Sequence, residues 1–142
     1  MASEEARRDL RSPIRYLSML LLAALTAQFL LGLWTNVEST PTTYPPTLAP
    51  HIALAYVLVL ASLATLLLCL LQREPRLWVP SLLVVAGVVL ASIEGERFLS
   101  DQNPLSSFGM GVGFLLSFSA ATFLHSSTIR RASLRAGGDL SA

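Results

Sequence analysis

Side chains of the types that bind divalent metals flank the long apolar stretches of this sequence, and three of them are candidate ligands. His51 opens the second such stretch, Glu94 closes the third, and Asp101 lies between the third and the fourth. Imidazole nitrogens and carboxylate oxygens are common zinc ligands, and a histidine beside carboxylates can also relay protons. His51, Glu94 and Asp101 are therefore a candidate metal site. The competing interpretation is interfacial polarity, with Arg97 paired to Glu94 three residues before it on a helix.

A second set of polar side chains lies inside the apolar stretches. Gln28 precedes Trp34 by six residues and Tyr56 follows His51 by five. At the rise of a helix these positions are about 9 Å and about 7.5 Å inside the apolar layer. One interpretation is a hydrogen bond between Gln28 and Tyr56 that joins two helices. The other is a cofactor pocket for a quinone or a haem, lined by Gln28, His51 and Tyr56.

The elements that must position these side chains are four uncharged apolar stretches. Each is about as long as a helix needs to cross ~30 Å of hydrocarbon. Apolar residues make up 53% of the 142 residues and charged residues only 13%, which is typical of a chain buried in lipid. We predict an all-α integral membrane four-helix bundle with antiparallel neighbours, in a transmembrane domain spanning 14–125. Its helices are expected at about 14–35, 51–71, 76–94 and 104–125.

The basic residues are all arginines, and their placement predicts an orientation. Nine of the ten lie before the first helix, between the second and third, or after the fourth; only Arg97 lies on the other side. By the positive-inside rule both termini are cytoplasmic. The chain then has a cytoplasmic N-terminal segment, 1–13, and a basic cytoplasmic tail, 126–142. We expect a multi-pass protein of the plasma membrane whose arginines meet anionic headgroups, with no nucleic-acid partner.

This orientation separates the two histidines. His51 is at the outer end of the second helix, whereas His125 is at the inner end of the fourth. A haem held by both is excluded, because about 30 Å of bilayer lies between them. A haem with His51 as its single protein ligand stays open. We expect His125 to cap the carbonyl groups at the end of the fourth helix.

Small residues recur at four-residue intervals in the third and fourth helices. Lipid gives helices no hydrophobic reason to associate, so small side chains that let backbones approach supply the contact. We therefore expect these two helices to be a close antiparallel pair. The residues predicted to pack are Gly87, Ala91, Gly95, Gly109, Gly113 and Ser117.

Proline and asparagine mark two helix starts. Pro75 fits the first turn of the third helix, because its missing N–H has no partner there in any case. Asn103 and Pro104 are typical of an N-cap and the first residue of the fourth helix.

Several local patterns are distinctive in combination: Gln28-Phe29-Leu30-Leu31-Gly32, His51-Ile52-Ala53-Leu54, Gly95-Glu96-Arg97-Phe98-Leu99, Ser106-Ser107-Phe108-Gly109-Met110 and Gly113-Phe114. Together they resemble a group of small uncharacterised four-helix membrane proteins of bacteria and archaea. The resemblance covers roughly residues 14–125, and the group has no firm activity to transfer.

More distantly, the layout is similar to one four-helix half of a haem A synthase. In that family histidines on the second and fourth helices hold haem near the outer face, and His51 matches the first of them. The fourth helix here has no histidine near its outer end, and no glutamate lies one turn before His51. The resemblance therefore implies a shared scaffold, without haem oxidation.

These observations lead to two expectations about function. The first is a protein without catalysis of its own, an accessory or assembly subunit of a membrane complex. It would bind a protein partner or a second copy within the lipid bilayer. The alternative is a membrane redox protein that binds haem or quinone in the outer pocket around His51.

Overall fold

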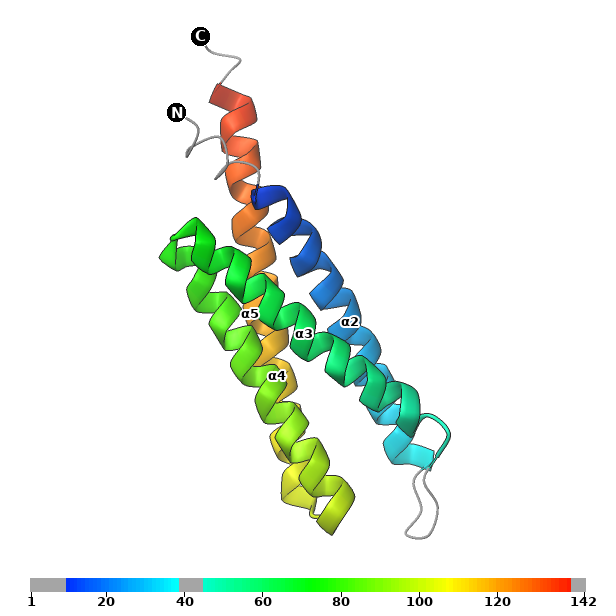
Figure 1. The fold of residues 1–142 in the computed structure, drawn as a ribbon. Coiled ribbons are helices and arrows are strands. Elements are labelled where there is room, and N and C mark those ends of the chain that lie inside the picture. Colours follow the sequence, from blue (N-terminus) through cyan, green and yellow to red (C-terminus); the bar gives the residue numbers. More distant parts are fainter. Residues whose placement is uncertain (1–9, 39–44, 139–142) are drawn as a thin grey trace.

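The computed structural model describes residues 10–38 and 45–138, which form four helices (Figure 1). All four are long and apolar enough to cross a membrane. The prediction of an all-helical chain with four such segments is confirmed. The helices are α2 (Arg11–Glu38), α3 (Leu48–Gln72), α4 (Pro75–Asp101) and α5 (Pro104–Gly138).

Each helix extends beyond the apolar stretch that predicted it. The third ends at Asp101 where about residue 94 was predicted, and the fourth ends at Gly138 where about residue 125 was predicted. Residues that favour helix, such as Glu96, Arg97 and Arg130, lie in these extensions, and the first glycine after His125 is Gly137. The predicted terminal segments are thus partly helical, and their residues 1–9 and 139–142 lie outside the described part of the chain.

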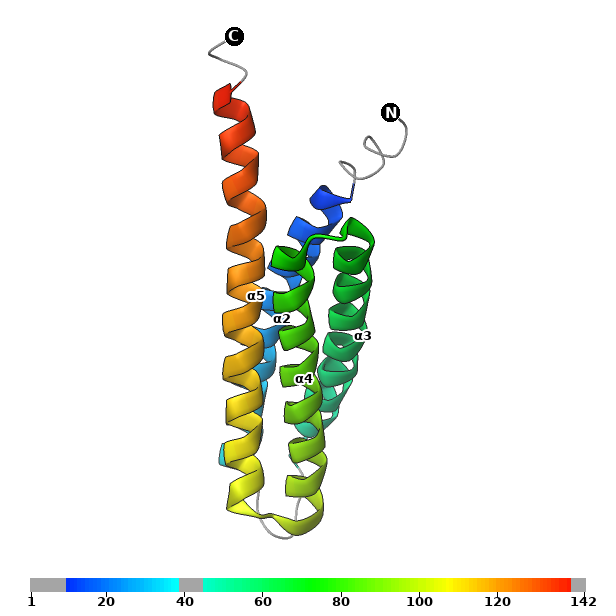
Figure 2. The same cartoon turned by 90° about the vertical axis from the view of Figure 1, so that its left-hand side faces the viewer.

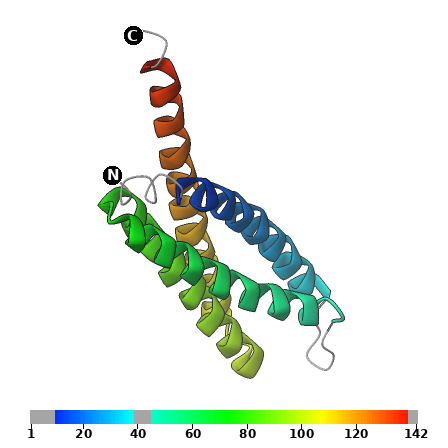
Figure 3. The ribbon, with the colours of Figure 1, turned by 45° about the horizontal axis from the view of Figure 1, so that its top comes forward.

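The helices form two hairpins, α2–α3 and α4–α5. Each helix packs against two others in the cyclic order α2, α3, α4, α5, and the α4–α5 contact is the most extensive. Figures 1 and 3 show the hairpins close together where α3 turns into α4, and diverging toward the opposite end. In Figure 2 the last turns of α5 extend past the other helices.

The α4–α5 interface is made where the two backbones touch. A Cβ atom added to Gly87 would lie 2.6 Å from the carbonyl oxygen of Gly113 and would also meet Ser117 Oγ. A Cβ atom on Gly113 would lie 2.7 Å from the amide nitrogen of Ala91. Ser117 Oγ donates to the carbonyl of Val84 at 3.2 Å. Only residues without a side chain fit at Gly87 and Gly113.

The same interface continues toward the α4–α5 turn. Gly95 lies opposite Met110, whose Sδ would be 3.4 Å from an added Cβ. Gly109 lies beneath Glu94, whose Cγ would be 2.7 Å away. The predicted small residues of both helices therefore lie along the interface between α4 and α5. Residues with higher sequence numbers on α4 contact residues with lower sequence numbers on α5.

Most of the apolar surface faces outward. The main core lies between all four helices and contains Leu21, Leu25, Leu58, Val84, Val88, Ala120 and Ala121. Only 17–33% of the most apolar segment of each helix is buried. Apolar side chains this exposed need a lipid or protein neighbour, because water would penalise them.

The α4–α5 turn has two local features that set where the helices end and begin. Asn103 Oδ1 accepts the N–H of Leu105 at 2.9 Å, so the predicted N-cap before Pro104 is confirmed. Gln102 ends α4 in the left-handed conformation, with φ 49°, and its N–H donates to the carbonyl of Phe98. This conformation is costly for a residue with a Cβ atom.

Replacing Gln102 with glycine is expected to stabilise the protein by about 0.5–1 kcal/mol, because glycine adopts positive φ without steric cost. Chemical unfolding in mixed detergent micelles, followed by circular dichroism, measures the change. The matched variant is Ser100→Gly, two residues earlier but inside the helix, which should lose about as much. A loss of stability in both variants would contradict the expectation.

Candidate functional site between helices α2 and α3

Gln28 and His51 form the main polar contact between α2 and α3. Gln28 Nε2 lies 3.3 Å from His51 Nε2. Because an amide nitrogen can only donate, the ring nitrogen accepts, and the proton of the neutral imidazole is on Nδ1. The two helices are therefore joined within the apolar layer by a neutral hydrogen bond.

Gly32 makes room for this contact. It follows Gln28 by four residues and so lies on the same face of α2. A Cβ atom at this position would lie 3.1 Å from His51 Cε1, so glycine lets the imidazole lie against the backbone of α2. Sequence reasoning did not select Gly32 as a site residue; its four-residue spacing from Gln28 was the available signal.

Not every hydrogen-bonding atom of the Gln28–His51 pair has a partner. Gln28 Oε1 and His51 Nδ1 are buried and have no hydrogen-bond partner. One acceptor and one donor are thus left over, and each costs about 1–3 kcal/mol of stability when buried without a partner. Unpaired groups of this kind need an explanation, and a bound molecule is a common one.

A line of polar side chains leads from this pair to the end of α2. Thr35 Oγ1 donates to Thr47 Oγ1 at 3.2 Å, and Thr47 Oγ1 donates to Glu38 Oε2 at 3.4 Å. Thr35 and Glu38 continue the face of α2 that carries Gln28 and Gly32, and Thr47 precedes His51 by one turn. The line covers about 15 Å of helix, from the exposed Glu38 to the half-buried Gln28.

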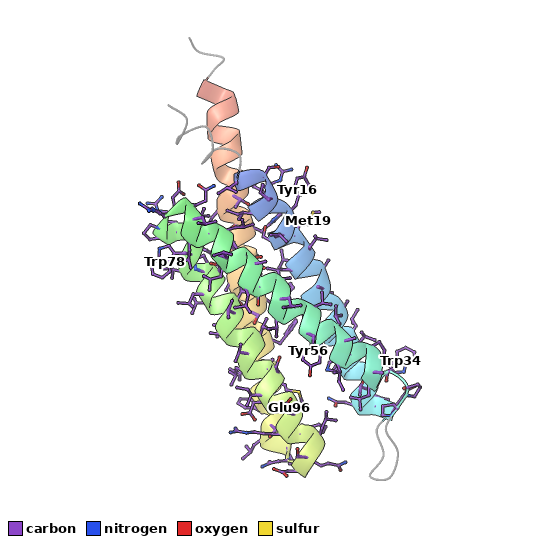
Figure 4. All side chains as sticks on the ribbon, in the orientation of Figure 1. Tyr16, Met19, Trp34, Tyr56, Trp78 and Glu96 are labelled. Atoms are coloured by element: carbon purple, nitrogen blue, oxygen red, sulfur yellow. The ribbon has the colours of Figure 1, made fainter. Side chains whose placement is uncertain are left out.

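Tyr56 does not join this site. Its side chain is 65% exposed and lies on the side of α3 away from α2 (Figure 4). Five residues turn an α-helix by about 140° beyond a full turn, so His51 and Tyr56 occupy different faces. The proposed bond between Gln28 and Tyr56 is absent, because Gln28 pairs with His51.

The candidate metal ligands are also apart. Glu94 receives a hydrogen bond from Arg97 Nη1 at 2.8 Å, which matches the competing interpretation of an ion pair. Glu94 and Asp101 belong to the α4–α5 hairpin, whose end diverges from the end that carries His51 (Figures 1 and 3). In residues 10–38 and 45–138 no three His, Cys, Asp or Glu side chains lie close enough together to hold a metal ion.

The second histidine makes a separate contact at the other end of α2. His125 Nδ1 lies 2.9 Å from the fully buried Ser18 Oγ, which joins α5 to α2. The predicted C-terminal cap is wrong, because α5 continues thirteen residues past His125 to Gly138. Ser18 and Gln28 are separated by about 15 Å of helix. The two imidazoles therefore join different pairs of helices: His125 joins α5 to α2, and His51 joins α3 to α2.

No protein family, curated protein or solved structure matches the chain. The resemblance to small four-helix membrane proteins and to half of a haem A synthase therefore stays a prediction.

Proposed function

We propose that the protein is a non-catalytic accessory or assembly subunit of a plasma-membrane complex, an antiparallel bundle with both termini in the cytoplasm. The arginine asymmetry supports this orientation. Aromatic side chains support the placement in the bilayer: Tyr16 and Trp78 lie at one end and Trp34 at the other (Figure 4). Along α2, Tyr16 and Trp34 are about 27 Å apart, close to the thickness of the hydrocarbon layer.

The main support for the proposal is a groove on the surface of α4 and α5. It has a volume of about 730 Å³ and is lined mainly by apolar side chains: Phe98, Pro104, Ser107, Phe108, Gly111, Val112 and Leu115. Gly111 is exposed, and a Cβ atom there would meet nothing within 4 Å. An exposed glycine lowers helix stability but lets another helix approach closely. We therefore assign the groove to a transmembrane helix of a partner subunit.

Photocrosslinking in native membranes tests this assignment. A benzoylphenylalanine at Leu115, in the groove, is expected to give one defined protein adduct, and the same probe at Tyr56 on α3 should not. Gly111→Leu should fill the groove and abolish the adduct while the protein remains folded, because nothing opposes a side chain there. Adducts with lipid alone would contradict the proposal, and adducts with a second copy would identify a homo-oligomer.

A further inference from the structure

The unpaired atoms of Gln28 and His51 define what a ligand must offer. Gln28 Oε1 can only accept and His51 Nδ1–H can only donate. The smallest group that meets both needs is a hydroxyl, which donates through its hydrogen and accepts through its oxygen. Neither side chain carries a charge in this arrangement, and Gln28 lies about 15 Å from the end of α2, while His51 is in the first turn of α3. A neutral, membrane-soluble molecule fits these conditions.

An aromatic surface lies on the neighbouring face of α2, about 100° around the helix from Gln28 and toward α5. Phe29, the residue after Gln28, stacks on Phe114 of α5 with ring centroids 4.7 Å apart and planes inclined by 20°. Phe114 stacks in turn on Phe118 at 5.6 Å. Such rings favour a flat aromatic neighbour. A quinol, an aromatic ring that carries hydroxyl groups, matches both the polar and the apolar parts of this region.

We propose that the Gln28–His51 pair binds a hydroxyl of a neutral membrane quinol, with Gln28 Oε1 accepting its hydrogen and His51 Nδ1–H donating to its oxygen. This binding site is independent of the groove on α4 and α5. Both atoms are covered in the structure, so binding separates α2 from α3 locally. Gly32 lies against His51, and the Thr35–Thr47 contact lies further along the same face of α2, so both would part with the pair.

Calorimetry on the full chain in lipid nanodiscs, under anaerobic conditions, tests the proposal with tetramethylhydroquinone as the probe. The matched control ligand is its dimethyl ether, which keeps the ring but cannot donate. The ether is expected to bind at least about tenfold more weakly, as one lost hydrogen bond predicts. Gln28→Leu and His51→Phe should each weaken quinol binding by a similar factor, whereas Tyr56→Phe should not change it.

A second measurement needs no variant. In ¹⁵N-histidine-labelled protein, the quinol should shift the Nδ1 signal of His51, and His125 provides an internal reference. Equal binding of quinol and ether would show partition into the bilayer and overturn the proposal. Unchanged His51 signals at saturating quinol would overturn it too, because they would mean that water or no ligand occupies the site. The groove and its partner would be unaffected by either result.

Discussion

Gly113→Val is expected to destabilise the protein by about 3 kcal/mol, the largest effect of any substitution considered for this fold. The first atom added at this position would lie 2.6 Å from the carbonyl oxygen of Gly87 and 2.7 Å from the amide nitrogen of Ala91. Backbone atoms cannot rotate away as a side chain would. The two helices must separate along their most extensive interface, and overpacking of this kind costs about 1–3 kcal/mol or more.

Gly111→Val is the matched control, because both substitutions replace a glycine inside α5 with the same β-branched residue. Nothing lies within 4 Å of a Cβ atom at Gly111, so its stability should change by less than about 1 kcal/mol. Reversible unfolding in mixed micelles of dodecyl maltoside and dodecyl sulfate gives both values. Equal losses at Gly111 and Gly113 would show that helix propensity, and not interhelical contact, determines the outcome.

The second large effect concerns the Gln28–His51 pair. Gln28→Leu should cost about 1–3 kcal/mol, since it leaves the half-buried imidazole without the one side-chain partner it has among the described residues. His51→Leu should cost a similar amount, because the amide of Gln28 is then left alone. The double variant removes every unpaired polar atom of the site, so its stability should return to that of the unmodified protein or exceed it.

A double-mutant cycle in the same micelles measures this coupling. The expected interaction free energy is about 1–3 kcal/mol, because residues in direct contact deviate from additivity. Additive losses would mean that the two side chains act independently and that the 3.3 Å contact contributes nothing. A double variant as stable as the parent yet unable to bind quinol would show that the pair is retained for binding and not for folding.

The sequence was most informative about features that depend on one helix at a time. Hydropathy located four spans, and Asn103 with Pro104 located the start of α5. Helix ends were underestimated because apolarity stops at the membrane surface, whereas hydrogen bonding continues through polar residues such as those after Glu94. The small residues of α4 and α5 were also found by spacing, since a face made of glycine and serine has few other uses inside lipid.

Features that depend on how helices rotate about their axes were harder to predict. Counting residues along each helix gave Gln28 and Tyr56 similar depths in the apolar layer. Depth alone does not determine the direction in which a side chain points. Counting residues from His51 shows that Tyr56 lies about 140° around α3. The prediction of a metal site was wrong for a related reason. His51 and Glu94 lie toward the same end of the bundle, but they belong to hairpins that diverge there. Nothing in the sequence encodes that divergence locally.

The divergence of the two hairpins gives the molecule unequal cross-sections in the two leaflets of a bilayer. Where α3 turns into α4 the helices are close together, and toward the other end they spread apart (Figures 1 and 3). A body of this form displaces more lipid from one leaflet than from the other. Lateral pressure within the bilayer therefore acts on the angle between the hairpins, and lipids with small headgroups in the leaflet that holds the wider end of the protein should favour a larger angle.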